Sequence, residues 1–440
     1  MADLHRVVIL GGGFGGLYAA QALKHSHVDV TLVDRRNYHL FQPLLYQVAT
    51  GSLSPGEIAA PIRGVLSEQK NATVLLGEAV DIDPNSKRIT LRDGGVVPYD
   101  SLIVATGSQA TYFGHDEWKI WAPGLKTIED ATMVRHKILL AFEAAERTTD
   151  PDQRRAWLTF VIVGGGPTGV ELAGALSEIS NETLKHDFRS IRPQDARIIL
   201  VDGGQRILNA FPADLSKSAE DQLVKLGARA RTGLTVTNVD ENGVTLKSAT
   251  GEEHIASHTV LWAAGVAVTE FARQLAKQTN APTDRSGRFK VTENLTVPQF
   301  PDIYVVGDLA YVENADKKPM PGVAQAAMQS GAYAAKDIVR KLKNDPAQKP
   351  FAYFNKGDLA VIGRAAAVAN VFGIHLTGLS AWVVWLFIHL MYIVEFQSRI
   401  LALVQWGFLY LTFNRGARLI TGTAASKLVK GTEPLENLGE

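Results

Sequence analysis

RVVILGGGFGGLYAAQALKH, residues 6–25, decides the fold, because an apolar run passes straight into glycines and then into a helical pattern. Residues 6–10 are predicted to form a short buried strand and residues 17–25 a helix. A second apolar strand, 28–33, ends on Asp34. The glycines of a G-x-G-x-x-G pattern are Gly11, Gly13 and Gly16. The segment therefore predicts a βαβ unit of the kind that binds a dinucleotide.

The same arrangement recurs later in the chain. In FVIVGGGPTGV, residues 160–170, an apolar strand again runs into glycines and a predicted helix, and the next strand, 198–201, ends on Asp202. The glycines of this second motif are Gly164, Gly166 and Gly169. The second motif follows the first by 153 residues, counted from Gly11 to Gly164. A repeat at that distance indicates two related dinucleotide-binding units.

Later strands complete the predicted architecture. LIVATG at 102–107 and VLWAAG at 260–265 are similar, since each is an apolar run that ends in small residues. IYVVGD at 303–308 is a further predicted strand, which ends in Gly-Asp. We expect an α/β fold with two Rossmann-like dinucleotide-binding domains, the second inserted in the first, and a C-terminal helical segment that associates with a membrane. The expected boundaries are 1–113 and 267–342 for the first domain, 114–266 for the second, and 343–440 for the C-terminal region.

Composition excludes several kinds of chemistry. Lys plus Arg and Asp plus Glu both number 45, so no excess of positive charge points to nucleic acid. The absence of cysteine excludes disulfides, cysteine-ligated zinc or iron–sulfur sites and a redox dithiol. Electron transfer must therefore use an organic cofactor, and no metal site is expected. No secretory pattern precedes the first strand, so we expect the chain in the cytoplasm.

Glycine loops between a strand and a helix let the backbone approach a pyrophosphate, which the N–H groups of the helix start can bind. Asp34 and Asp202 are candidates to accept from a ribose 2′-hydroxyl, although an Asp that ends a strand is also common as a solvated residue. Because Asp202 is followed by Gly203 and Gly204 rather than Arg, an extra 2′-phosphate would be repelled. We therefore predict a preference for NADH over NADPH.

The two glycine motifs, LIVATG and IYVVGD together resemble the flavoproteins with two dinucleotide-binding domains. Without cysteine, the disulfide reductases and sulfide:quinone oxidoreductases of that superfamily are excluded. Three further segments resemble the type II NADH:quinone oxidoreductases, and this resemblance covers essentially the whole chain. They are FQPLLYQVATG with PGEIAAPIR (41–51 and 55–63), AQAAMQ (324–329) and NRGARLI (414–420).

The resemblance implies that the first motif binds FAD, that the second binds NADH, and that Asp308 holds the ribityl or phosphate region of the flavin. A turn or N-cap Asp is the alternative at that position. The implied cofactor-binding residues are Gly11, Gly13, Phe14, Gly15, Gly16, Asp34, Arg35, Gln47, Ala105, Thr106, Gly107, Asp308, Ala324, Gln325, Gly164, Gly166, Pro167, Thr168, Gly169, Asp202 and Gly265.

Glu171, Gln325 and Gln329 are the catalytic residues that the resemblance implies. Gln325 and Gln329 would share one helix face and bond a quinone carbonyl or the flavin edge, whereas without the resemblance such a pair is usually solvated. Glu171 would contact the nicotinamide region and transfer a proton to quinone, although a Glu in a first helical turn also complements the helix dipole. Lys356 could lie near a quinone carbonyl or be a solvated lysine.

The C-terminal region contains two apolar runs, 381–394 and 400–413, separated by Glu395, Gln397 and Arg399. Each run would span about 21 Å as a helix, short of a ~30 Å hydrocarbon core. We predict two interfacial amphipathic helices; a buried helical pair, a dimer interface and a true span are the alternatives. Residues predicted at the headgroup boundary are Trp382, Trp385, Tyr392, Trp406 and Tyr410, and those predicted to meet anionic lipid are Arg399, Arg415, Arg418, Lys427 and Lys430.

The predicted function is FAD-dependent, non-proton-pumping NADH:quinone oxidoreduction. The expected partners are a membrane quinone, either ubiquinone or menaquinone, and the lipid surface on the cytoplasmic face of the cell membrane, where the protein would be peripheral and monotopic. The sequence leaves undecided whether the protein forms a homodimer. A soluble NADH-dependent reductase of a carrier protein and a redox-sensing flavoprotein are the alternative functions, and quinone dependence separates them from the first.

Overall fold

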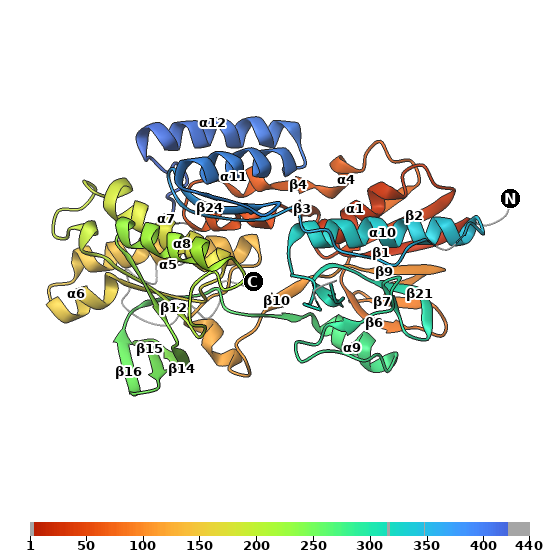
Figure 1. The fold of residues 1–440 in the computed structure, drawn as a ribbon, viewed down its shortest axis with the longest axis horizontal. Coiled ribbons are helices and arrows are strands. Elements are labelled where there is room, and N and C mark those ends of the chain that lie inside the picture. The colour runs from red at the N-terminus through yellow and green to blue at the C-terminus, as the bar shows by residue number, and fades with distance from the viewer. Residues whose placement is uncertain (1–3, 315–316, 347, 421–440) are drawn as a thin grey trace. The chain divides into compact units, whose positions relative to one another are not determined.

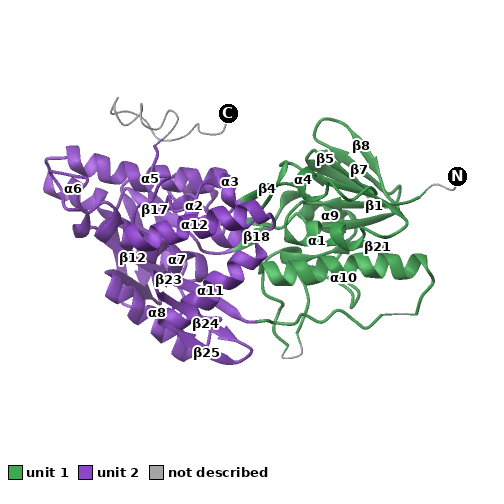
Figure 2. Ribbon diagram, turned by 90° about the horizontal axis from the view of Figure 1, so that it is seen from above, with its two compact units in different colours: residues 1–40, 59–109, 266–356 green, residues 41–58, 110–265, 357–440 purple. Residues whose placement is uncertain are grey.

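The computed structural model describes residues 4–314, 317–346 and 348–420. The chain forms two compact units, coloured separately in Figure 2. Unit 1 comprises Met1–Leu40, Ala59–Gln109 and Val266–Lys356, and unit 2 comprises Phe41–Ile58, Ala110–Gly265 and Gly357–Glu440. The expected domain boundaries differ from these units, since 41–58 and the region after residue 356 belong to unit 2, whereas 343–356 belongs to unit 1.

Unit 1 is built on a six-stranded sheet in the order β20-β21-β9-β1-β2-β5, parallel except for β20. Its central strand β1 is buried from Val7 to Leu10, which explains the unbroken apolar run. Helices α1 and α10 cover one face of the sheet and pack closely, because a Cβ at Gly331 would lie 2.0 Å from the Gly15 carbonyl oxygen. The main elements are β1 (His5–Leu10), α1 (Phe14–Ala22), β2 (Val28–Asp34), β5 (Ala72–Leu76), β9 (Ser101–Val104), β20 (Thr296–Val297), β21 (Phe300–Val305) and α10 (Ala324–Leu342).

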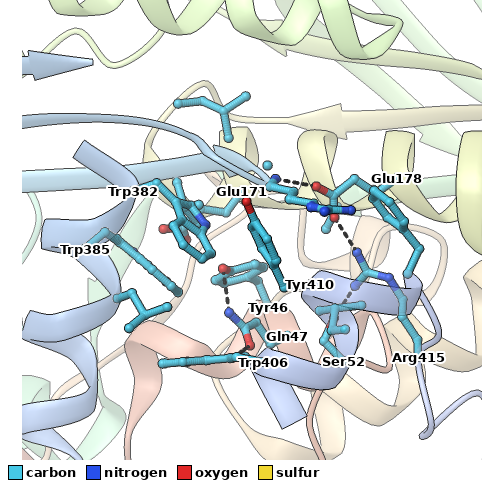
Figure 3. A pocket seen from close by; sticks show the side chains of 18 residues that line it. Tyr46, Gln47, Ser52, Glu171, Glu178, Trp382, Trp385, Trp406, Tyr410 and Arg415 are labelled. Atoms are coloured by element: carbon cyan, nitrogen blue, oxygen red, sulfur yellow. Dashed lines mark hydrogen bonds and ion pairs between the residues drawn. The ribbon is translucent and has the colours of Figure 1, made fainter. Parts of the chain in front are cut away.

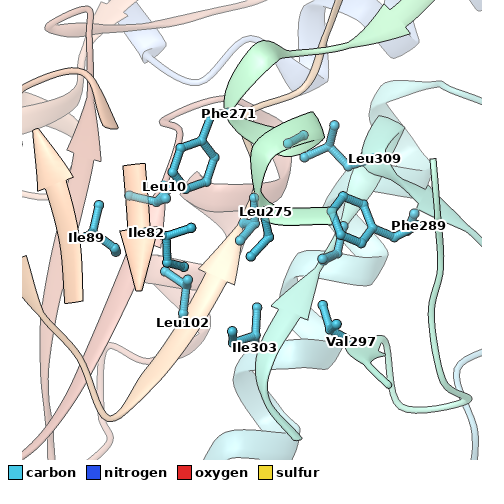
Figure 4. Packing of buried hydrophobic residues seen from close by; sticks show 14 of the residues in the cluster. Leu10, Ile82, Ile89, Leu102, Phe271, Leu275, Phe289, Val297, Ile303 and Leu309 are labelled. Carbon is cyan, nitrogen blue, oxygen red and sulfur yellow. The ribbon is translucent and has the colours of Figure 1, made fainter. Parts of the chain in front are cut away.

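The other face of this sheet carries the main apolar core of unit 1. A small antiparallel sheet and α9 bring Ile82 and Leu275 against Leu10 and Leu102 of the central strands (Figure 4). The remaining elements of unit 1 are β3 (Tyr38–Leu40), β4 (Ala59–Pro61), α4 (Ile62–Val65), β6 (Ala79–Asp83), β7 (Arg88–Leu91), β8 (Val96–Pro98), β18 (Val266–Val268), α9 (Glu270–Gln278), β19 (Phe289–Lys290), η5 (Gly307–Leu309) and β22 (Ala310–Tyr311).

Unit 2 contains a second parallel sheet, in the order β13-β12-β11-β17. Its first crossover, from β11 through α7 to β12, repeats the arrangement of β1, α1 and β2 in unit 1, which confirms the prediction of two Rossmann-like folds. The elements are η1 (Gln42–Leu44), α2 (Leu45–Ala49), α3 (Pro55–Ile58), η2 (Asp116–Ile120), α5 (Ile128–Arg147), α6 (Pro151–Trp157), β11 (Thr159–Val163), α7 (Pro167–Glu178), η3 (Ile179–Thr183), η4 (Pro193–Asp195), β12 (Arg197–Asp202), α8 (Ala213–Leu226), β13 (Ala228–Thr232), β14 (Thr235–Asp240), β15 (Gly243–Ser248), β16 (Gly251–Ala256) and β17 (Thr259–Trp262), with β10 (Ser108–Ala110) where the chain enters.

The C-terminal part of unit 2 is a three-stranded antiparallel sheet followed by two helices. The elements are β23 (Asp358–Gly363), β24 (Ala366–Val371), β25 (Ile374–Thr377), α11 (Gly378–Tyr392) and α12 (Phe396–Thr412). Strand β23 packs on α7, where a Cβ at Gly174 would lie 1.6 Å from the Ile362 carbonyl oxygen. This close approach, which only glycine permits, explains why the segment belongs to unit 2 rather than forming a separate region.

The two apolar runs of the C-terminus are separate helices, as predicted (Figure 1). Among the described residues, no helix combines the length and the hydropathy that crossing a bilayer requires. Two of the predicted headgroup residues are placed differently, because Trp385 and Trp406 are buried at 3% and 6% exposure and pack against each other. Lys427 and Lys430 lie outside the described residues.

Candidate cofactor and substrate sites

The first glycine loop has the geometry that a dinucleotide requires. Gly11 adopts φ +102°, and a Cβ there would lie 2.4 Å from the Ala105 carbonyl oxygen. A Cβ at Gly16 would lie 1.8 Å from the Gly11 carbonyl oxygen, so both positions exclude a side chain. Gly13, the N-cap of α1, makes no side-chain cap, and a Cβ there would meet no atom within 4 Å. The space above the helix start is thus open, and its N–H groups can bind a pyrophosphate.

The second glycine loop has the same construction. Gly164 adopts φ +113°, with a hypothetical Cβ 2.6 Å from the Ala263 carbonyl carbon, and a Cβ at Gly169 would lie 1.8 Å from the Gly164 carbonyl oxygen. Gly166 caps α7 above open space. Pro167, the first residue of α7, has no N–H to satisfy, and Thr168 follows it. Both loops therefore fit dinucleotide phosphates for the same steric reasons.

Each strand-end acid hydrogen-bonds its own glycine loop. Asp34 accepts from the backbone N–H of Gly12 at 2.5 Å and of Arg36 at 2.7 Å. Asp202 accepts from the backbone N–H of Gly165 and Gly204, both at 2.6 Å. The two carboxylates thus lie beside the loops in equivalent positions, which supports equivalent roles toward two bound nucleotides.

The remaining cofactor-binding candidates of unit 1 lie on loops at the carboxyl ends of its parallel strands or next to them. Ala105 continues β9 and donates its N–H to the Leu10 carbonyl at 2.8 Å. Thr106 bonds the Thr269 hydroxyl at 3.0 Å, and Gly107 follows at φ +68°. Asp308 accepts from the Ser108 hydroxyl at 2.5 Å.

Three further cofactor-binding candidates lie apart from this group: one at the start of α1, one on the surface of unit 1 and one in unit 2. Phe14 packs edge-on against His39, with ring centroids 4.9 Å apart. Arg35 is exposed. Gly265 of unit 2 adopts φ +72° against the Phe113 ring, where a Cβ would approach to 2.5 Å.

Gln325 and Gln329 lie on one face of α10, as their spacing predicts, and both bond the same segment. Gln325 accepts from the Lys356 N–H at 3.1 Å and donates to the Asn355 side chain at 3.2 Å. Gln329 accepts from the Phe354 N–H at 3.0 Å and donates to its carbonyl at 2.9 Å. Ala324 begins this helix. The structure therefore brings Gln325, Gln329 and Lys356 together, with both amides fixing residues 354–356.

Glu171 and Gln47 line a pocket of about 620 Å³ that lies wholly within unit 2 (Figure 3). The wall is largely aromatic, from α11, α12 and residue 46. The named residues in Figure 3 are Tyr46, Gln47, Ser52, Glu171, Glu178, Trp382, Trp385, Trp406, Tyr410 and Arg415. Such a lining, apolar with a few polar groups, suits a flat organic molecule.

Glu171 is the acid of this pocket and is only 9% exposed. Burial raises the pKa of its carboxyl well above the usual value, although a hydrogen bond with the Val361 backbone opposes the shift. The protonated form is therefore favoured. Burial, and then the nearby Glu171, also raise the pKa of Tyr46, whose hydroxyl accepts from Gln47 Nε2 at 2.8 Å. Burial thus disfavours the charged form of both groups.

Arg415 and Glu178 form a buried ion pair at the edge of the pocket. Arg415 donates to Glu178 at 2.8 Å, with side-chain exposures of 2% and 12%. Arg415 also donates to the hydroxyls of Thr50 and Ser52, and Glu178 accepts from the Arg364 N–H at 2.5 Å. This network joins α7, the turn after β23 and the segment after α12.

The aromatic wall contains a buried polar atom that has no hydrogen-bond partner among the described residues. Trp382 packs on Tyr410 with ring centroids 5.2 Å apart, and the Arg364 guanidinium lies 4.1 Å from the centre of the Tyr410 ring. Trp385 packs on Trp406, yet its buried Nε1 has no hydrogen-bond partner among the described residues. Because buried donors are normally satisfied, a ligand carbonyl is a natural partner for it.

Sequence reasoning missed the roles of Tyr46, Glu178, Arg364 and Arg415 in this pocket. Tyr46 lies inside the FQPLLYQVATG segment and Arg415 inside NRGARLI, so both stood in stretches that had been singled out. A signal was available for Arg415, since a charged residue directly after a 14-residue apolar run needs a partner or a surface. Nothing local marks Glu178 or Arg364.

Comparisons with known proteins identify the family. Residues 5–331 match the family described as pyridine nucleotide-disulphide oxidoreductase. The chain is 45% identical over 427 residues to the type II NADH:quinone oxidoreductase Ndh of Mycobacterium tuberculosis, covering 96% of this chain and 91% of the relative. It is 47% identical to NdhA of the same organism, covering 95% and 89%.

Solved structures share the fold. The structure of NDH2 from Plasmodium falciparum in complex with NADH superposes with a TM-score of 0.84 at 21% identity, covering 96% of this chain and all of that one. The sulfide:quinone oxidoreductase of Aquifex aeolicus has a TM-score of 0.67 at 17% identity, covering 98% and 96%. At these identities the likeness is one of fold.

Proposed function

The chain belongs to the type II NADH:quinone oxidoreductases, within the pyridine nucleotide-disulphide oxidoreductase family, and on that premise we propose where it holds its cofactors and its quinone. It oxidises NADH and reduces quinone, with FAD as its cofactor. Bound FAD supplies the hydride acceptor that the chain itself lacks. The residues of the chain bind, orient and move protons.

FAD is assigned to unit 1 and NADH to unit 2. The open space above Gly13 and above Gly166, at two helix starts with the same flanking glycines, supports one pyrophosphate at each. Asp34 and Asp202 would each accept from a ribose hydroxyl while holding the loop. In unit 2 the carboxylate of Asp202 would repel a 2′-phosphate, so NADH is preferred over NADPH.

Quinone is assigned to the aromatic pocket of unit 2, and the buried acid Glu171 carries this assignment. Reduction of a quinone by two electrons takes up two protons, and a protonated Glu171 can donate one at the ring oxygen that it faces. Tyr46 would orient the same end of the ring. The unpartnered Nε1 of Trp385 would donate to a carbonyl, and the aromatic wall would exclude water.

Gln325, Gln329 and Lys356 are proposed as a second polar group of the substrate and flavin region. Their support is the shared contact of both amides with residues 354–356. In that arrangement the two glutamines position this segment, and Lys356, which is exposed, would lie near a quinone carbonyl.

The helices α11 and α12 are proposed to lie on the lipid surface, with the protein peripheral on the cytoplasmic face of the membrane. Large apolar side chains remain exposed on both helices, and a lipid-soluble substrate requires access from the bilayer. These residues are Leu379, Val383, Phe387, Met391, Phe396, Ile400, Leu401, Leu403, Val404, Phe408 and Leu411. A homodimer that covers the same faces is the competing assignment.

The deciding experiment separates the two half-reactions. Full-length enzyme in lipid is mixed with NADH alone, and then with a quinone, while flavin absorbance is followed. We expect Glu171→Gln to leave flavin reduction by NADH near normal and to slow reoxidation by quinone. Reoxidation unaffected by this change removes Glu171 from the quinone site, and reoxidation only by a carrier protein favours the soluble reductase.

A further inference from the structure

Arg135, on α5, is a buried cation without a counter-ion. Only 8% of its surface is exposed, and its Nε is buried without a hydrogen-bond partner among the described residues. No ion pair with a described carboxylate relieves it, and burial alone lowers the pKa of the guanidinium. Buried guanidinium groups are stable in proteins only when an anion or several acceptors surround them. The described part of the chain thus leaves this guanidinium without a carboxylate partner and its Nε without an acceptor.

A second, small pocket lies at this arginine and wholly within unit 2. The end of α2, at Ala49 and Gly51, forms one wall, and Arg418 forms another. Arg418 is half-buried and donates to Asp187 at 2.6 Å, which fixes its guanidinium beside the pocket. No carboxylate is among the described residues that line the pocket. Arg135 is thus the guanidinium of this lining that has no described carboxylate partner, and it lies among apolar side chains and the paired Arg418.

We propose that this pocket binds a phosphate-class oxyanion, supplied either as free phosphate or as the phosphate group of an anionic lipid. Guanidinium forms paired hydrogen bonds with phosphate oxygens and binds them more strongly than neutral donors do. Arg135 would be the main ligand and Arg418 the second. A lipid is a reasonable source, because Arg418 follows the end of α12 at Thr412 by only six residues. This inference does not depend on the quinone assignment.

The first test is thermal. Unfolding of the FAD-loaded full chain is followed in increasing inorganic phosphate, with chloride and acetate at the same ionic strength as references. We expect Tm to rise with phosphate and to saturate, because a ligand that binds only the folded state stabilises it. Arg135→Met should abolish the part of the Tm increase that saturates at the lowest phosphate concentrations. In phosphate-free buffer the same change should raise Tm, since it removes an unpaired buried charge.

Arg147→Met is the matched control, since Arg147 is an exposed arginine on the same helix. It should keep the full phosphate response. The comparison of the two variants also separates this pocket from the glycine loops, which both variants retain. An equal loss of the response in Arg147→Met, or an unchanged response in Arg135→Met, would overturn the proposal for free phosphate.

The second test identifies the source of the anion. Sedimentation with phosphatidylcholine vesicles is compared with sedimentation with vesicles that also contain phosphatidylglycerol. A lipid ligand predicts that Arg135→Met loses several-fold of the extra binding to the anionic vesicles and keeps the binding to neutral ones, whereas Arg147→Met keeps both. A thermal response to phosphate without an Arg135-dependent vesicle effect assigns the site to free phosphate.

The absence of both the phosphate response and the anionic-vesicle response in the wild-type chain would reject the proposal altogether.

Discussion

Trp406 Nε1 donates a 2.6 Å hydrogen bond to Gln47 Oε1, which joins α12 to a residue 359 positions earlier in the chain. Gln47 in turn donates to the hydroxyl of Tyr46. Helix α12 therefore exposes apolar side chains on one face, and with its other face it holds the polar side chains of the pocket wall in place. Within unit 2, contacts made by α12 and the shape of the pocket depend on each other.

Trp406→Phe tests this connection. The change removes the indole donor and leaves Gln47 Oε1 buried without a partner, which should lower the free energy of unfolding by about 1–3 kcal/mol. The quinone KM should rise several-fold while flavin reduction by NADH stays near normal. Trp385→Phe is the contrasting variant, because its Nε1 has no partner to lose. It should raise the quinone KM and lower stability only through the lost packing of the buried ring, and a fall in Tm as large as that of Trp406→Phe would contradict the assignment of an unused donor.

Glu171 makes stability depend on pH in a defined direction. Its pKa in the folded protein is raised by burial, so above the pKa of an unfolded glutamate, ~4.3, the folded state holds more protons than the unfolded one. Stability from this group is therefore lost as pH rises toward the folded pKa. Glu171→Gln cannot ionise and should flatten that part of the curve, which thermal unfolding between pH 4 and pH 8 would measure.

The same substitution separates a catalytic acid from a structural one. Glutamine keeps the shape and hydrogen bonding of the side chain but cannot donate a proton, so the quinone half-reaction should slow by about 10²-fold or more. FAD content should remain complete. Restored turnover in the Glu171→Asp variant would support proton donation, whereas equal rates for Gln and wild type would show that another group supplies the proton.

Removing one partner of the Arg415–Glu178 pair should lower the free energy of unfolding much more than removing both. Arg415→Met leaves Glu178 buried without its partner and should cost about 3–5 kcal/mol of unfolding free energy. The double variant with Glu178→Met should recover much of this loss. Arg231→Met is the control, since its pair with Glu253 at 2.7 Å is largely exposed and should change stability by about 0–1 kcal/mol. Denaturant unfolding of the wild type, Arg415→Met, Glu178→Met and the double variant gives the coupling free energy, and additive effects would argue against a coupled buried pair.

Substitutions at two glycines of the first loop should have different effects, one on flavin binding and the other on folding. A Cβ at Gly13 meets no protein atom, so Gly13→Val should fold yet occupy the space of the pyrophosphate and leave the protein largely colourless. A Cβ at Gly16 would lie 1.8 Å from a carbonyl oxygen, so Gly16→Ala should disturb the fold itself. Flavin absorbance and circular dichroism distinguish the two results. Full flavin in a folded Gly13→Val protein would remove this loop from the FAD site.

Both dinucleotide folds were predictable because their determinants are local. Gly16 cannot carry a side chain because the Gly11 carbonyl, five residues earlier, occupies that space, and Asp34 follows at the end of the next strand. The spacing alone therefore carries the information. The two C-terminal helices were also predictable, since charged residues interrupt the apolar pattern at Glu395 and Arg399.

The quinone pocket was less accessible to sequence reasoning, because its walls come from segments hundreds of residues apart. Glu171 faces residues 46 and 361, and Arg415 reaches back to Glu178, so no periodicity or spacing records these contacts. Aromatic residues in an apolar helix suit a membrane boundary or a buried pocket equally. Only the packing of Trp385 on Trp406 decides that this pair is buried.

The outward faces of α11 and α12 predict how the protein meets a membrane. Phe387 and Phe408 are 62% and 52% exposed, so a charge at either position should not disturb the core. The double variant Phe387→Glu, Phe408→Glu should bind neutral lipid vesicles at least tenfold less, because burying carboxylates at the lipid surface is unfavourable. Turnover should fall with a long-chain quinone and persist with a short-chain soluble one.

Val224→Glu on α8 is the control, since Val224 is equally exposed but lies on a helix of mainly polar surface, and it should change neither binding nor turnover. Point changes are preferable to removing residues 379–440, because that deletion would also take away Trp385, Trp406 and Arg415 from the pocket. If the double variant keeps its vesicle binding but changes from dimer to monomer in sedimentation velocity, the apolar faces belong to a subunit interface. If it loses vesicle binding at unchanged oligomeric state, they belong to the lipid surface, where a quinone enters from the bilayer.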